Sequence, residues 1–191
     1  MKRKSILALG ASNTFGYDPR SYLGSRYPRD VRWTGILSGE GYDVINYGHN
    51  GLMIPPERDF KGLSELIKSR LPVDIITVML GTNDLLQGLT ASETAARMET
   101  FLRFVKITAG DAEVILIATP AMKRGEWVQT NTLIEESARL SPMYRALCEK
   151  LGVTFLDAGE WGVELSYDGV HFSEEGHAAF ARGLMEYLSR K

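Results

Sequence analysis

The chain has 191 residues, of which 44% are hydrophobic and 24% are charged, the balance of an ordinary globular protein. Lys and Arg total 22 while Asp and Glu total 24, so the formal net charge is −2, which argues against a nucleic-acid partner. The single cysteine, Cys148, excludes an intramolecular disulfide, and no Cys and His framework with zinc spacing accompanies it.

The N-terminus resembles a signal peptide only in its charge. A basic start is followed by an apolar stretch that ends at Gly10, which is too short for a signal sequence. No segment approaches the roughly 20 apolar residues that a membrane-spanning helix needs. We therefore expect one domain covering residues 1–191, no membrane span and a cytoplasmic location.

Five short apolar runs predict buried β-strands. They are rich in β-branched and large apolar residues and lack polar alternation, a pattern typical of parallel strands covered on both faces. The runs are residues 5–9, 42–47, 74–80, 113–119 and 153–156.

Helical patterns alternate with these strands. The predicted helices are residues 31–38, 57–69, 92–108, 131–151 and 173–189. In the third, Met98, Phe101, Leu102 and Val105 recur at helical spacing with charges between them. Alternation of strand and helix predicts a three-layer α/β/α sandwich around a five-stranded parallel sheet in the flavodoxin-like order 2-1-3-4-5.

Polar motifs follow the predicted strands. Ser12 stands in a glycine-bounded turn after the first strand, a glycine-rich run at residues 46–51 follows the second, and Asn83 follows the third. Asp168 and His171 come after the last strand, immediately before the final helix. In such sheets ligands bind outside the carboxyl ends of the strands, so we expect these side chains at one edge.

These residue types support acyl transfer. A serine becomes a nucleophile when a base removes its proton, and imidazole is suited to that task at neutral pH. His171 is the predicted base for Ser12, and Asp168 is close enough in sequence to orient its ring. The backbone N–H groups of Ser12 and Gly51 and the side-chain amide of Asn83 are candidate donors to an oxyanion.

The motifs GASNTFG, NYGHNG, GTND and DGVH, in this order, resemble the blocks of the SGNH hydrolases, also called GDSL esterases and lipases. The resemblance covers most of the chain. It places the family's Ser, Gly, Asn and His on Ser12, Gly51, Asn83 and His171, and its acidic position on Asp168. It implies a serine esterase in which Ser12, Asp168 and His171 are catalytic and Ser12, Gly51 and Asn83 form the oxyanion hole.

A narrower resemblance points to short-chain substrates. The stretches RWTGIL, MLGTND and DAG are similar to the branch of aryl esterases and acyltransferases within this family. They imply short acetyl, aryl or sugar esters as small-molecule substrates. Transfer of the acyl group to an alcohol, instead of to water, needs the same residues and stays open as an alternative.

One position departs from the family pattern. Where the family has Gly-Asp-Ser, this chain has Gly10-Ala11-Ser12, so the aspartate beside the nucleophile is missing. This favours a re-tuned enzyme and leaves a second alternative, a non-catalytic module that binds an ester or a carbohydrate.

Further residues are candidate substrate contacts. His49 lies in the glycine-rich run, and Trp127 lies in the segment 120–130 after the fourth strand, so both are candidates for substrate binding. Tyr17, Tyr22 and Tyr27 suit either carbohydrate stacking or packing, whereas His177 is expected as a surface or partly packed residue of the final helix.

The serine mechanism requires no metal or cofactor, and the sequence offers no nucleotide-binding loop. The turn around Ser12 lacks the middle glycine of a dinucleotide-binding motif. No Gly-Lys-Ser/Thr of a P-loop follows it either.

Overall fold

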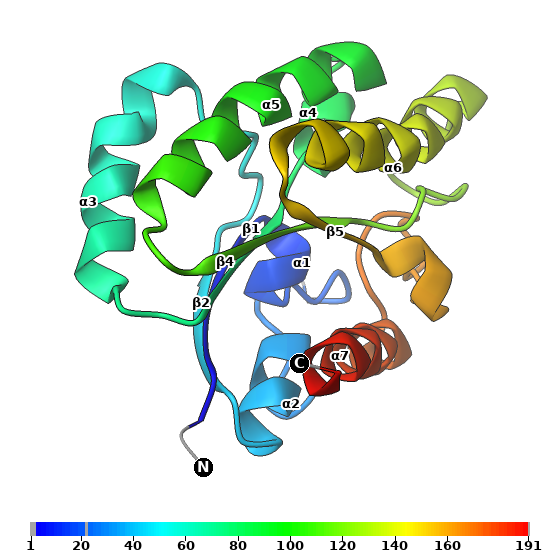
Figure 1. The fold of residues 1–191 in the computed structure, drawn as a ribbon. Helices are drawn as coiled ribbons and strands as arrows, with labels where there is room; N and C mark the ends of the chain where they lie inside the picture. The colour runs from blue at the N-terminus through cyan, green and yellow to red at the C-terminus, as the bar shows by residue number, and fades with distance from the viewer. Residues whose placement is uncertain (1–2, 22, 191) are drawn as a thin grey trace.

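The computed structural model describes residues 3–21 and 23–190 as a three-layer α/β/α structure (Figure 1). Its sheet has five parallel strands in the order β2-β1-β3-β4-β5, which confirms the predicted fold class. The strands are β1 (Ser5–Gly10), β2 (Asp43–Gly48), β3 (Ile75–Met79), β4 (Glu113–Ala118) and β5 (Thr154–Asp157).

Helices cover both faces of the sheet. The α-helices are α1 (Ser12–Phe15), α2 (Trp33–Gly39), α3 (Phe60–Arg70), α4 (Thr82–Leu86), α5 (Ala91–Thr108), α6 (Asn131–Leu151) and α7 (Glu174–Ser189), and the 3-10 helices are η1 (Glu57–Asp59) and η2 (Ala158–Trp161). Helices α3, α5 and α6 lie on one side, and α2 and α7 lie on the other (Figure 1). All ten predicted elements are present, with ends within three residues of their predicted positions, and α1 and α4 are additional short helices.

The sheet separates two hydrophobic clusters. Alternate residues of β1 face opposite sides, with Leu7 and Leu9 in the cluster under α3, α5 and α6, and Ile6 and Ala8 in the cluster under α2 and α7. The central strands are buried on both faces, as predicted. The edge strands β2 and β5 are only partly buried, because each has a neighbour on one side alone.

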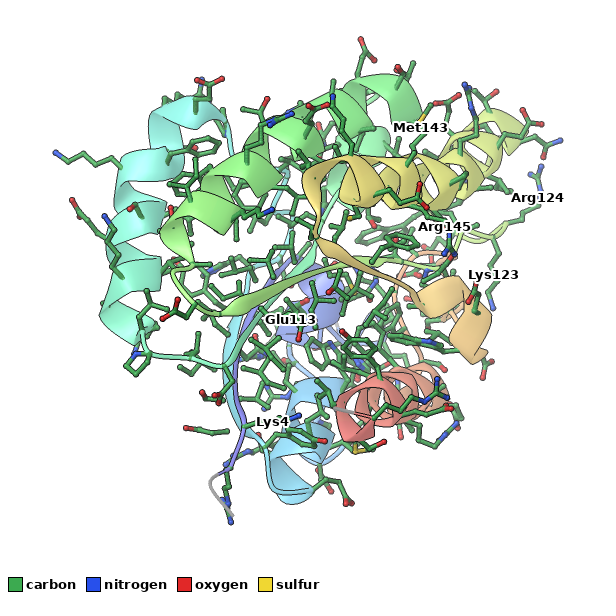
Figure 2. The ribbon with its side chains drawn as sticks, in the orientation of Figure 1. Lys4, Glu113, Lys123, Arg124, Met143 and Arg145 are labelled. Atoms are coloured by element: carbon green, nitrogen blue, oxygen red, sulfur yellow. The ribbon has the colours of Figure 1, made fainter. Side chains whose placement is uncertain are left out.

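The amino ends of the strands are tied together by polar side chains. Lys4 donates a hydrogen bond to the carbonyl of Leu188 at the end of α7, and Glu113 accepts hydrogen bonds from Thr154 and Tyr187 (Figure 2). These contacts fix the C-terminal helix against the start of the sheet. The opposite edge, at the carboxyl ends of the strands, carries the motifs that the sequence analysis singled out.

No helix within residues 3–21 and 23–190 is both long and apolar enough to cross a membrane.

His177 is fully buried, so the expectation of a surface or partly packed residue is wrong. It lies on the apolar face of α7 in helical register with Phe180 and Leu184, and its ring packs edge-on against Tyr27 and Phe172 at 5.3 and 5.4 Å between centroids. Burial, and to a smaller extent the electrostatic influence of the neighbouring Arg32 and His171, lowers the pKa of His177 to about 3.

This burial predicts a pH-dependent stability. Because the folded-state pKa of His177 lies below its ordinary value of 6.5, between these values the unfolded chain binds a proton that the folded chain excludes. The contribution of His177 therefore reduces stability as pH falls below 6.5, by up to about 1.4 kcal/mol per pH unit. Urea denaturation of wild type and His177→Gln between pH 7.5 and pH 5, roughly the range where histidine titrates, should give a shallower decline for the variant. Equal declines would show that His177 does not carry this effect.

Candidate active site

Ser12 is the first residue of α1 and is presented by a tight turn at the end of β1. A Cβ atom on Gly10 would lie 2.0 Å from Thr14 Oγ1 and 3.1 Å from the carbonyl oxygen of Met79, so only glycine fits there. Gly16, with a φ of 86°, ends the helix in the left-handed conformation that favours glycine. The turn leaves Ser12 8% exposed at the carboxyl edge of the sheet.

Asp168 and His171 occupy a compact loop between β5 and α7. Asp168 Oδ1 accepts hydrogen bonds from the backbone N–H groups of Val170 and His171, at 2.9 and 3.0 Å. Gly169 allows this turn with a φ of 82°. The loop therefore fixes the Asp168 carboxylate relative to the backbone that carries the imidazole.

The structure brings Ser12, Asp168 and His171 into one hydrogen-bonded chain. His171 Nδ1 lies 2.6 Å from Asp168 Oδ2, and His171 Nε2 lies 2.9 Å from Ser12 Oγ. Asp168 is 0% exposed and His171 is 3% exposed, so the hydrogen bond between them is shielded from bulk water. This is the arrangement that a serine, an imidazole and a carboxylate need for proton transfer.

Asp168 stays ionised in this environment. Burial by itself would raise the pKa of its carboxyl, but hydrogen bonds from His171 and from the backbone of His171 and Val170 outweigh burial and hold the pKa below its usual range.

Gly51 and Asn83 lie in the segments that follow β2 and β3, the two strands that flank β1. Gly10 pairs with Gly48 of β2 and with Met79 of β3, so the segments after these strands flank the serine turn. Asn83 Nδ2 donates a hydrogen bond to the carbonyl of Leu52 at 3.0 Å, which joins the two segments. Gly51 is exposed, with a φ of 70° and no atom within 4 Å of a Cβ built on it.

A buried ion pair holds the segment that follows Gly51. Asp84 is 0% exposed, accepts a hydrogen bond from the backbone N–H of Ile54 at 3.0 Å and pairs with Arg97 at 2.9 Å. Arg97 in turn donates to the carbonyl of Ile54 at 2.8 Å. Burial raises the pKa of Asp84, against the lowering effects of Ile54 and Arg97. No sequence pattern predicted this role for Asp84, the last residue of the motif GTND.

Asn13 joins the serine turn to the histidine loop and was also missed. Its Nδ2 donates to the carbonyl of Val170 at 3.2 Å, and its Oδ1 accepts from the N–H of Phe172 at 2.9 Å. The amide thus binds the backbone on both sides of His171. No periodicity marks it, because the two segments are 159 residues apart.

Two aromatic rings pack against the imidazole, and we call Tyr17 and Trp127 the aromatic frame. Their ring centroids lie 4.6 and 4.9 Å from that of His171. Trp127 is 49% exposed. Of the other tyrosines considered from sequence, Tyr27 is buried among packed rings, and Tyr22 lies outside the described residues.

The loop that carries Trp127 follows β4 and is fixed by backbone hydrogen bonds to the loop that carries Asp168 and His171. Lys123 donates to the carbonyl of Gly169 at 3.1 Å, and Trp127 donates to that of Asp168 at 3.0 Å. Figure 2 labels Lys123 and Arg124 of this loop, beyond the end of β4. The indole is therefore positioned by the same backbone that positions Asp168.

His49 lies apart from the imidazole of His171. Its side chain is exposed and packs edge-on against Tyr47 at 4.6 Å, while its backbone N–H donates to the carbonyl of Gly10 at 3.1 Å. His49 is therefore the first residue of the segment that runs from the end of β2 toward α3, and its backbone is bonded to the end of β1.

Ala11 occupies the N-cap position of α1. Its carbonyl accepts hydrogen bonds from Thr14 and Phe15, and no side chain caps the helix. Among the described residues, no group of three His, Cys, Asp or Glu side chains is arranged to hold a metal ion.

The comparisons with known proteins identify the family of the chain. The GDSL-like lipase/acylhydrolase family matches residues 8–179, so the chain belongs to this family, the SGNH hydrolases. Among solved structures, Est24, a carbohydrate acetylesterase from Sinorhizobium meliloti, is similar at 26% identity and a TM-score of 0.84, covering 98% of this chain and 99% of that chain. The aryl esterase of M. smegmatis is similar at 27% identity, with the same TM-score and coverage.

A comparison with curated proteins gave no match. Family membership and the esterase neighbours support ester hydrolysis as the general class of reaction.

The amide bridge of Asn13 predicts a stability effect. Asn13→Ala removes the amide that bonds the Val170 carbonyl and the Phe172 N–H and leaves both backbone groups without this partner. The substitution should lower the free energy of unfolding by about 1–3 kcal/mol. Urea denaturation measures this change. The same substitution at exposed Asn50 is the control and should stay within about 0.5 kcal/mol of wild type. Equal stabilities for the two variants would contradict the bridge.

Proposed function

We propose that this chain is a serine esterase that hydrolyses short-chain carboxylic esters through an acyl-enzyme intermediate. The observation that carries the proposal is the buried hydrogen-bonded chain from Asp168 through His171 to Ser12. Membership of the GDSL-like lipase/acylhydrolase family supports the same chemistry.

In the acylation step, Ser12 Oγ attacks the ester carbonyl carbon while His171 Nε2 takes its proton. The hydrogen bond to Asp168 selects the tautomer in which Nδ1 carries the proton, which leaves the Nε2 lone pair facing Ser12. The ionised Asp168 stabilises the imidazolium that forms. His171 then returns the proton to the leaving alcohol, and the acyl group stays on Ser12.

The oxyanion is stabilised by the backbone N–H groups of Ser12 and Gly51 and by the side-chain amide of Asn83. An amide nitrogen carries two protons, and the bond to Leu52 uses one of them, so the second remains for the substrate. Such a preorganised donor contributes on the order of 3–4 kcal/mol to the transition state. In deacylation, water attacks the same carbonyl with His171 as base and releases the acid.

The alcohol part of the ester lies beside the aromatic frame. Because His171 must protonate the leaving oxygen, the alcohol or aryl group is next to His171, where Tyr17 and half-exposed Trp127 present their rings. Aromatic faces suit planar aryl groups and the apolar faces of sugars. The aryl esterase and the carbohydrate acetylesterase among the structural neighbours support aryl and acetylated sugar esters as substrates.

Ser12→Ala tests the nucleophile. The variant should lose hydrolysis of para-nitrophenyl acetate and labelling by a fluorophosphonate probe together, because both reactions need the Ser12 Oγ. Its thermal midpoint should stay close to that of wild type. Ser92→Ala, at an exposed position of α5, is the matched control and should keep both activities.

Two outcomes would overturn this assignment. Turnover retained in Ser12→Ala would dismiss Ser12 as the nucleophile. A folded wild type without labelling or turnover would favour the non-catalytic binding module, with Ala11→Asp as the next variant.

The orienting role of Asp168 predicts a graded loss. His171→Ala should reduce kcat as much as Ser12→Ala, whereas Asp168→Ala should leave about one to two orders of magnitude more activity, because the base is still present. Steady-state kinetics with para-nitrophenyl acetate measures the difference. An Asp168→Ala variant as inactive as His171→Ala, in a folded protein, would mean that the carboxylate does more than orient the ring.

A further inference from the structure

A cavity of about 570 Å³ is lined by His49, whose backbone N–H donates to the carbonyl of Gly10, and by Leu52, whose carbonyl accepts from Asn83. It is lined by the segment that follows β2, by the first turns of α3 and by Arg97 of α5. Its apolar lining includes Leu52, Ile54, Pro55 and Leu63. The volume lies within the range of natural small-molecule sites and far exceeds what an acetyl group fills.

The cavity shares a wall with the proposed oxyanion hole. His49 and Leu52 line the cavity and enclose Gly51 in sequence. His49 is bonded to the backbone of Gly10, two residues before Ser12, while the carbonyl of Leu52 accepts from Asn83. The cavity therefore adjoins the segment that carries Gly51 through the residues on both sides of this glycine.

The chemistry of the reaction decides which part of the ester lies there. Around the carbonyl carbon, Ser12 attacks from one side and the oxyanion points to Gly51 and Asn83. The leaving oxygen must face His171, which approaches from the loop before α7. The remaining substituent, the acyl chain, is directed away from His171. Neither of the rings that pack against His171 lines the cavity, whereas His49 and Leu52, which flank Gly51, do.

Three charged side chains line the cavity beside its apolar residues, namely Arg58, Asp59 and Arg97. Arg97 is paired with the buried Asp84 and with the Ile54 carbonyl, so its charge is already compensated. Arg58 lies near Asp59, and both are exposed at the rim with His49. The cavity thus offers an apolar surface to an uncharged chain and a polar rim to solvent.

We propose that this cavity is the acyl-chain site of the enzyme and that it accepts unbranched acyl groups longer than acetyl. The proposal rests on the serine esterase function proposed above. Each methylene buried against Leu52, Pro55 and Leu63 adds favourable apolar contact, so kcat/KM rises with chain length until the cavity is filled. His49, at the rim, contacts the chain and not the reacting carbonyl.

Gly62 of α3 allows a direct test. It lines the cavity, and a Cβ built on it meets no atom within 4 Å, so a larger side chain fits without moving the backbone. Leucine is also a better helix former than glycine, so Gly62→Leu should not lower the thermal midpoint. The substitution occupies space in the cavity and leaves Ser12 and His171 unchanged.

The experiment compares para-nitrophenyl acetate, butanoate, hexanoate and octanoate. Gly62→Leu should lower kcat/KM for hexanoate and octanoate by about tenfold, the effect of about two lost methylene contacts, and leave that for acetate within about twofold. Gly39→Leu, on α2 across the sheet, is the matched control, because a Cβ there also meets no atom within 4 Å. Gly39→Leu should keep the wild-type dependence of kcat/KM on acyl-chain length.

Three results would overturn the acyl-chain site. One is an equal loss of kcat/KM for all four esters, and another is no change for any of them. The third comes from a parallel assay of octyl acetate by acid release: if Gly62→Leu loses activity toward this ester while the four para-nitrophenyl esters are unaffected, the alcohol part lies in the cavity. Failure of the serine mechanism itself is detected separately, as turnover that survives in Ser12→Ala.

Discussion

The buried hydrogen bond between Asp168 and His171 is the interaction on which the site depends. A carboxylate that is fully enclosed needs compensation, and it finds this in the imidazole and in two backbone N–H groups of its own loop. The same contacts fix the ring so that its other nitrogen faces Ser12. A polar group that would destabilise the fold when unpaired thus becomes the element that orients the proposed base.

The parallel sheet explains why distant segments meet at this point. Strands β1, β2 and β3 end side by side, so the turn with Ser12 and the segments with Gly51 and Asn83 begin as neighbours. Side-chain bridges then set the finer positions, through Asn13 toward the histidine loop and through the buried Asp84 and Arg97 toward Ile54. The sheet brings the groups close, and the bridges determine their orientation.

Sequence reasoning succeeded where a residue follows from periodicity or from an ordered motif. Apolar runs located the five strands, and the four motifs located Ser12, Asp168 and His171, which the structure brings together. It failed where packing decides. Helix α1 is too short to show a period, and the amide of Asn13 has partners that only the folded chain brings near. The burial of His177 was predictable from its register with Phe180 and Leu184, yet its polarity suggested the surface.

The large separation of Ser12 and His171 in the sequence has a consequence during synthesis and folding of the protein. The turn that carries Ser12 follows the first strand and the loop that carries His171 precedes the last helix, so the two bonded residues are 159 positions apart in the sequence. During synthesis from the N-terminus, Ser12 is therefore present long before its proposed base has left the ribosome. In the proposed mechanism the serine is activated only when the loop with His171 docks, so a chain that ends before this loop lacks the base for the reaction.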